Sequence, residues 1–144
     1  MEIKKVSIAE KLDQIHDYWN PRIVAELNGQ QVKLTKLKGE FVWHSHDHED
    51  EMFLVIEGDF KIELRDGIIS LNPGEFIVIP RGIEHRPFSD GEAYVMLFEP
   101  ANTLNTRNVK NAFTRENLEK IWSSWATEWS GQNIAEIMIK YPVA

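Results

Sequence analysis

The segment WHSHDHEDE at residues 43–51 decides how the rest of the chain is interpreted. It holds three of the chain's five histidines together with four acidic residues. Alternate side chains of an extended strand share one face, so His44 and His46 can point together into an interior. The MFLVIEG sequence at 52–58 is typical of a buried strand that follows them. The histidines are therefore either metal ligands between two strands or part of a polar turn.

Two further side chains can complete a metal site with this pair. Glu51 begins the returning strand, where its carboxylate can meet the histidines across the sheet, and His85 follows the turn at 80–82 and offers a third imidazole. Three neutral imidazoles and one carboxylate suit Zn, Fe, Mn, Ni, Co or Cu and leave coordination positions open. The sequence contains no cysteine, which excludes thiolate ligands. Spacing alone leaves both the metal site and the polar turn open.

Composition narrows the class of protein. A chain of 144 residues with 42% hydrophobic and 27% charged residues is typical of a single globular domain. Sixteen Lys and Arg against 23 Asp and Glu give a net charge of −7, which disfavours nucleic acid or an anionic membrane as a partner. The N-terminal sequence has no apolar core of a signal peptide, and no apolar run approaches the length of a membrane span. We expect a cytoplasmic protein.

Short strands and tight turns dominate residues 20–100. RIVAEL (22–27) and QVKLTKL (31–37) flank Asn28-Gly29, a sequence that favours a two-residue hairpin turn. Further strands are expected at 52–58, 60–65, 68–71, 76–80 and 93–99, with turns at 66–67, 72–74, 81–82 and 90–91. Many short strands at such spacing predict an all-β sandwich or barrel.

Helical patterns flank this region. Ile8, Leu12 and Ile15 recur at helical spacing after Ser7, a suitable N-cap, which predicts a short helix ending before Asn20-Pro21.

Near the other end, residues 102–111 suggest an extended crossing segment, and Thr114 is expected to cap an amphipathic helix. Its apolar stripe consists of Leu118, Ile121, Trp122, Trp125 and Trp129. A small barrel offers little surface on which to bury three indoles, so we expect this C-terminal helix to form a homodimer contact.

Two segments resemble the paired motifs of the cupin superfamily. The first motif, G(X)5HXH(X)3–4E(X)6G, is matched by residues 39–58, except that the gap between Gly39 and His44 is one residue short. The second, G(X)5PXG(X)2H(X)3N, is matched by residues 74–89, except that Ser89 stands in place of Asn.

The resemblance implies a jelly-roll barrel, also called a double-stranded β-helix, over residues 21–100 with a divalent metal inside one mouth. The helical segment 1–20 and the extension 101–144 are expected to belong to the same domain. The motif positions select as ligands His44, His46, Glu51 and His85. A pairing of His46 with His48 would place Glu51 outside the motif, so His48 is assigned to a turn or to the rim of the pocket.

The chemistry is less constrained than the fold, because the chain resembles small single-domain cupins of uncharacterised function. A dication held by one carboxylate keeps a net positive charge, which favours a small, oxygen-rich and anionic ligand. An isomerase- or epimerase-like enzyme, a dioxygenase-like enzyme and a non-catalytic binding or sensing module all remain open. Candidate ligand-binding residues are Phe53 and Val55, which share the parity of Glu51, together with Arg81 and His48. For each of these four, core packing or a solvated turn is the alternative.

Overall fold

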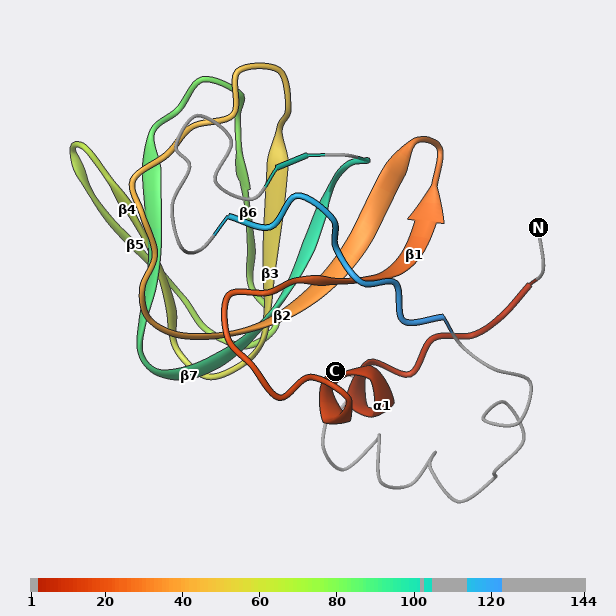
Figure 1. Ribbon diagram of the computed structural model, residues 1–144. Coiled ribbons are helices and arrows are strands. Elements are labelled where there is room, and N and C mark those ends of the chain that lie inside the picture. The colour runs from red at the N-terminus through yellow and green to blue at the C-terminus, as the bar shows by residue number, and fades with distance from the viewer. Residues whose placement is uncertain (1–2, 102, 105–113, 123–144) are drawn as a thin grey trace.

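The computed structural model describes residues 3–101, 103–104 and 114–122 (Figure 1). Within them the secondary structure consists of one helix and seven strands. In chain order these are α1 (Ile8–Asp13), β1 (Arg22–Leu27), β2 (Gln30–Glu40), β3 (Glu51–Glu57), β4 (Phe60–Leu64), β5 (Gly67–Leu71), β6 (Phe76–Ile79) and β7 (His85–Pro100). The all-β architecture expected from the sequence is confirmed.

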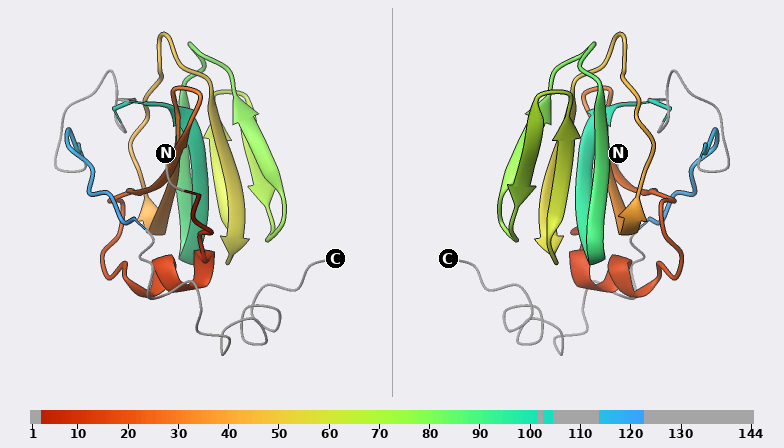
Figure 2. Two further views of the ribbon diagram at one scale, coloured as in Figure 1. Left: turned by 90° about the vertical axis from the view of Figure 1, so that its right-hand side faces the viewer. Right: turned by 90° about the vertical axis from the view of Figure 1, so that its left-hand side faces the viewer.

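The strands form a double-stranded β-helix in which β7 belongs to both layers. One layer has the strand order β1-β2-β7-β3-β6, and β4 pairs with β5 and with the first part of β7. Every pairing between named strands is antiparallel. In the side views of Figure 2 the strands run alongside one another as curved layers, with the red helix α1 at one end. The two layers enclose the interior that holds the candidate site.

The change of layer within β7 corrects one expectation. A turn was predicted at Asp90-Gly91, but both residues lie within the continuous strand His85–Pro100. The register between β2 and β7 shifts here, because Leu37 pairs with Ala93 while Gly39 pairs with Ser89. Asp90 and Gly91 therefore form an exposed irregularity within β7, near the point where its pairing with β4 ends. A bulge is typical of such a position.

Alternation along the strands separates an inner core from an outer one. The inner cluster includes Phe53 and Val55 of β3, Phe60 and Ile62 of β4, and Val95 of β7. A second cluster lies outside the barrel, where Leu12 and Ile15 near α1 pack against Val24 and Leu34. Helix α1 therefore covers part of the outer face and leaves the interior to the strands.

The N-terminal helix is present but shorter than expected. The Ser7 side chain accepts a hydrogen bond from the Glu10 backbone N–H at 3.3 Å, which confirms the predicted N-cap. The helix ends at Asp13, and the Ile15 backbone N–H donates to Leu12 O in a tighter last turn.

The C-terminal helix expected from Thr114 is not present over residues 114–122. Instead, Ile23 N donates to Glu119 O at 2.9 Å and Ile121 N donates to Ile23 O at 2.8 Å, so this segment lies along β1 as a parallel bridge. The free edge of β1 supplies hydrogen-bond partners, and the outer cluster buries Ile121. These two contacts outweigh the helical periodicity. The rest of the expected helix, with Trp125 and Trp129, lies outside the described residues.

Gly58, at the end of the first motif, is expected to be intolerant of any side chain. Its φ is +82°, and a Cβ at this position would lie 2.3 Å from Glu92 O. We expect Gly58→Ala to lower the free energy of unfolding by at least about 2 kcal/mol in urea denaturation. Gly29→Ala is the matched control, because Gly29 has a φ of +75° but nothing within 4 Å of its Cβ position. Equal losses in the two variants would contradict the close approach at Gly58.

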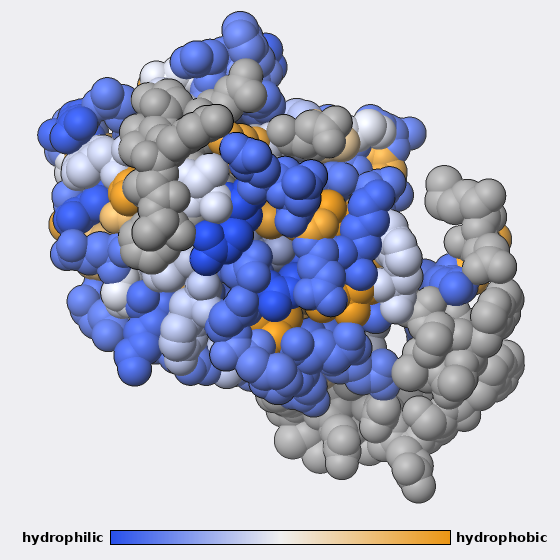
Figure 3. All heavy atoms as spheres, viewed as in Figure 1, coloured by the Kyte–Doolittle hydropathy of each residue, from blue (hydrophilic) through white to orange (hydrophobic). Residues whose placement is uncertain are grey.

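The outer surface is mixed in character. On the face drawn in Figure 3, the coloured residues show small separate groups of apolar side chains among hydrophilic ones. Exposed apolar side chains also occur on β5 and β6 and on the connection that follows, at Ile68, Ile69, Phe76, Val78 and Ile83.

Candidate metal centre

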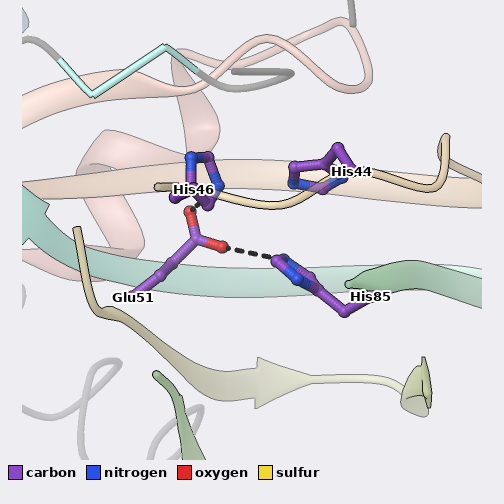
Figure 4. Close-up of side chains that lie close together, drawn as sticks. All are labelled: His44, His46, Glu51 and His85. Carbon is purple, nitrogen blue, oxygen red and sulfur yellow. Dashed lines mark hydrogen bonds and ion pairs between the residues drawn. The ribbon is translucent and has the colours of Figure 1, made fainter. Parts of the chain in front are cut away.

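Four side chains converge inside the barrel from three parts of the chain (Figure 4). His44 and His46 lie on the connection between β2 and β3, Glu51 is the first residue of β3, and His85 is the first residue of β7. Reciprocal backbone hydrogen bonds join His44 and His85, at 3.1 Å and 2.9 Å. Gly82 N donates to His46 O at 2.7 Å and ties the second-motif turn to the first. The two motifs therefore form one site.

The spacing of the four groups fits a single ion. Each residue offers a ligand atom, and these atoms all lie within 4.8 Å of one another. Glu51 lies centrally, with Oε2 3.4 Å from His46 Nε2 and Oε1 3.3 Å from His85 Nε2. Ligands about 2.1 Å from a common ion lie about 3–4.2 Å apart, so small side-chain movements would close the set around a metal.

The protein fixes which ring nitrogens face the centre. Nδ1 of His44 lies 2.9 Å from Val42 O, and Nδ1 of His85 lies 3.0 Å from Ile83 O. Each carbonyl selects the tautomer with a proton on Nδ1 and leaves the Nε2 lone pair directed inward, as in many metal sites. Within the described part of the chain, Nδ1 of His46 has no hydrogen-bond partner, and Nε2 of this ring has only the Glu51 carboxylate nearby, at 3.4 Å. A buried imidazole without a partner is costly, and a metal would satisfy it.

Burial and hydrogen bonding together set the protonation states of His44 and Glu51 that metal binding requires. All four side chains are at most 4% exposed. Burial, followed by the nearby His85 ring, lowers the pKa of His44 from 6.5 to about 4. Burial would raise the pKa of Glu51, but hydrogen bonding to Glu99, His46 and His85 outweighs it and holds that pKa well below its usual value. A neutral imidazole and an ionised carboxylate are the forms that bind metal ions.

The depressed pKa of His44 predicts acid sensitivity of the metal-free protein. Between pH 6.5 and about 4 the unfolded chain binds a proton at this residue and the folded chain does not. This contribution to stability is complete above pH 6.5 and is lost as the pH falls toward 4, by up to about 3 kcal/mol. We expect urea denaturation of the metal-free protein to show this loss and His44→Gln to lack it. Other groups contribute to both proteins, so identical pH slopes in the two would contradict the assignment.

A pocket adjoins the cluster, and Glu99 in its lining belongs to a buried charge pair. Lys33 Nζ lies 2.6 Å from Glu99 Oε1, and the two side chains are 1% and 2% exposed. The polar lining of the pocket consists of Thr35, His44, Glu51 and Glu99. Burial and then the Glu51 carboxylate raise the pKa of Glu99 well above its ordinary value, although the ammonium of Lys33 opposes the shift. The pKa values of Glu51 and Glu99 are thus shifted in opposite directions, and the contact with Lys33 is what favours the ionised form of Glu99.

The sequence-based site residues omitted Lys33 and Glu99. The signal is clear for Glu99, which shares strand parity with Val95 and Leu97, and weaker for Lys33, which shares it with Leu37 but also with Gln31 and Thr35. Charged residues at positions whose neighbours of the same parity are apolar indicate a buried pair.

Of the four candidate ligand-binding residues, the structure places one in the lining of the pocket. Phe53 lines it, whereas Val55 packs within the inner core and is not among the lining residues. Arg81 is 62% exposed and pairs with Asp50 at 3.2 Å, and His48 is exposed on the β2–β3 connection. The ligand-binding roles of these four residues stay predictions, and only Phe53 contacts the pocket.

A jelly-roll barrel with a buried group of three histidines and one glutamate defines the class of protein. Comparison with known families agrees, since residues 24–99 match the cupin domain family. The chain belongs to this family.

Similarity extends to individual proteins. A cupin-2 domain containing protein from Shewanella frigidimarina NCIMB 400 is 44% identical, with a TM-score of 0.65 over 66% of this chain and 93% of that one. Protein NMB1881 from Neisseria meningitidis is 31% identical, with a TM-score of 0.63 over 68% of this chain and 100% of that one. Uncharacterized protein YdbB of Bacillus subtilis strain 168 is 32% identical over 82 residues, which is 56% of this chain and 70% of the relative.

Within the described residues, no helix is long and apolar enough to cross a membrane.

Proposed function

We propose that the protein binds one divalent transition metal through His44, His46, Glu51 and His85 and presents it to a small oxygen-rich ligand in the adjoining pocket. The observation that carries the proposal is the buried cluster itself, whose potential ligand atoms lie within 4.8 Å of one another. When bound, such a metal supplies Lewis acidity toward an oxygen atom of the ligand. Zn, Fe, Mn, Ni, Co and Cu all suit this set of ligands.

The charge of the site favours an anionic ligand. A dication with one bound carboxylate keeps a net charge of about +1. His44 and Glu51 belong both to the cluster and to the lining of the pocket, so a ligand that fills the pocket reaches the metal.

We propose catalysis as the first candidate role. The sequence identifies no separate acid or base beyond the metal ligands, and this lack would favour a non-catalytic binding module. Glu99 now supplies a carboxyl group in the lining of the same pocket, and this group can hold a proton close to a bound ligand. Isomerisation, epimerisation and oxygen-dependent cleavage all use such an arrangement, and a sensing module is the second candidate.

The cellular location and the oligomeric state are further proposals. The composition supports a cytoplasmic location. Trp122 is 50% exposed beside β1, which supports a homodimer contact at this end of the chain.

The test combines metal analysis with a substrate panel. The protein is purified without added metal, its metal content is measured, and the metal-loaded form is incubated with small sugars, oxo acids and enolisable ketones. Turnover that depends on the metal and disappears in His85→Ala supports the enzyme. Thermal stabilisation by a compound that is recovered unchanged supports the binding module. A protein that takes up no divalent metal contradicts both.

A further inference from the structure

We propose that the ligand of this pocket has a flat apolar body behind its metal-binding oxygen atoms and is not a polyhydroxylated chain. The inference rests on the proposed function, because it assumes that oxygen atoms of the ligand reach the metal. It goes further by assigning the chemical class of the remainder of the ligand.

The wall of the pocket is mainly hydrocarbon. Seven of its eleven lining residues are apolar, and its mouth is open to solvent. The apolar lining is formed by Trp19, Pro21, Leu37, Phe41, Phe53, Pro87 and Leu97. These side chains come from β2, β3, β7 and the connections around them, so the apolar surface surrounds a ligand on several sides.

An aromatic surface leads from this wall to the metal ligands. The rings of Trp19 and Phe41 are stacked with centroids 4.7 Å apart and an interplanar angle of 20°. The Phe41 ring meets the His44 ring edge-on at 5.4 Å. A planar group packed along these rings would have its polar end beside His44, one of the proposed ligands.

Trp19 is held in place by an unusual backbone conformation. Its φ is +56°, which is uncommon for a bulky residue. Its backbone N–H donates to Lys36 O at 3.0 Å, and its indole Nε1–H donates to Lys38 O at 3.0 Å. Both hydrogen bonds fix the indole against β2. A strained residue held by specific contacts at a pocket wall points to a role in that pocket.

The wall offers few partners for hydroxyl groups. Beyond the metal ligands His44 and Glu51, the polar lining comprises Thr35 and Glu99, and Lys33 already engages Oε1 of Glu99, which leaves Oε2 for one hydrogen bond to a ligand. A polyhydroxylated ligand would bury several hydroxyl groups without partners, and each such group weakens binding. An apolar body has no hydroxyl groups to leave without partners, and its transfer from water into the pocket favours binding.

The test uses 2-oxo acids that share one metal-binding head and differ in the body. Pyruvate, 2-oxobutanoate, 4-methyl-2-oxopentanoate and phenylpyruvate are titrated calorimetrically into the metal-loaded and the metal-free protein. Hydroxypyruvate is the matched polar probe, because its hydroxyl group replaces the terminal methyl group of 2-oxobutanoate. We expect phenylpyruvate to bind the metal-loaded protein at least about 10-fold more tightly than pyruvate. We expect 2-oxobutanoate to bind at least about 3-fold more tightly than hydroxypyruvate.

A substitution in the pocket lining tests whether this lining causes the preference for an apolar ligand body. Leu37→Thr places a hydroxyl group in the pocket without touching a metal ligand, and we expect it to reduce the ratio of phenylpyruvate to pyruvate affinity by at least about 3-fold. Leu27→Thr makes the same change at a residue that is 44% exposed on the same hairpin and is expected to leave the ratio unchanged. The metal content of each variant is measured in parallel.

The outcomes separate this inference from the proposed function. Metal-dependent binding with equal affinities across the series, or with hydroxypyruvate preferred, overturns this inference alone. A protein that holds its metal but binds none of the five acids in a metal-dependent way overturns the proposed function and this inference with it.

Discussion

The His85→Ala variant is expected to bind Co²⁺ or Zn²⁺ more than about 100-fold more weakly than the unchanged protein. Loss of a hydrogen-bond partner behind a metal ligand already weakens binding by about 10- to 100-fold, and loss of the ligand itself has a larger effect. His85 is fully buried, its ring lies 3.3 Å from Glu51, and its tautomer is set by Ile83 O. The dissociation constants can be measured by competition with a chromogenic chelator.

His48→Ala is the matched control for this measurement. His48 lies in the same histidine-rich segment as His44 and His46, but it is exposed and does not belong to the buried group. We expect its affinity for metal to stay within about 3-fold of the unchanged protein. Similar affinities in the His85 and His48 variants would show that the metal binds elsewhere. Circular dichroism of the metal-free variants checks that each keeps its β structure.

The second large effect is expected at the buried pair of Lys33 and Glu99. Glu99→Leu leaves the Lys33 ammonium inside the barrel without its carboxylate, and we expect the free energy of unfolding to fall by about 3–5 kcal/mol. The double variant Lys33→Met/Glu99→Leu removes both charges and is expected to recover most of this loss. Urea denaturation of the metal-free proteins measures all three.

An exposed pair provides the comparison. Lys61 and Asp90 lie 2.6 Å apart, the same distance as Lys33 and Glu99, but Asp90 is 80% exposed. We expect Asp90→Ala to cost less than about 1 kcal/mol. If the double variant were as unstable as Glu99→Leu, the loss would come from packing and not from the isolated charge.

The paired motifs predicted the barrel and the site together, because both depend on local geometry. The motif spacing brought His44, His46 and Glu51 together, although the two histidines lie on a connection and not on the strand that was expected, and His44 pairs with His85 through an isolated bridge. Ser89 departs from the family motif, yet it is 1% exposed and its hydroxyl donates to Asp59 O at 2.6 Å. A smaller side chain than asparagine therefore still holds the β3–β4 connection to β7.

Long-range contacts account for what the sequence did not predict. The helical spacing from Thr114 to Trp122 was a local signal, but the open edge of β1 and the outer cluster around Ile121 determine the structure there. The turn signal at Asp90-Gly91 was equally local. Strand β7 continues through these two residues because it pairs with β4 before them and with β2 after them. The pairing of Lys33 with Glu99 joins residues far apart in sequence, so its two members could only be recognised from their parity.

The shape of the pocket likewise depends on tertiary structure. Trp19 was part of no sequence motif, and its place against Phe41 results from hydrogen bonds to the β2 backbone. Phe53, in contrast, was accessible to prediction because it follows Glu51 at the strand repeat. Phe53 was thus predictable from its place on a regular strand, whereas Trp19 lies on a connection that carries no motif.

The central claim is that three imidazoles and one carboxylate bind one ion inside the barrel. Extended X-ray absorption fine structure of the protein loaded with one equivalent of Zn²⁺ tests it most directly. We predict scattering from three imidazole nitrogens and at least one oxygen, all at about 2.0–2.2 Å, with His85→Ala reduced to fewer imidazoles. A spectrum of the unchanged protein with one imidazole or none would contradict the account.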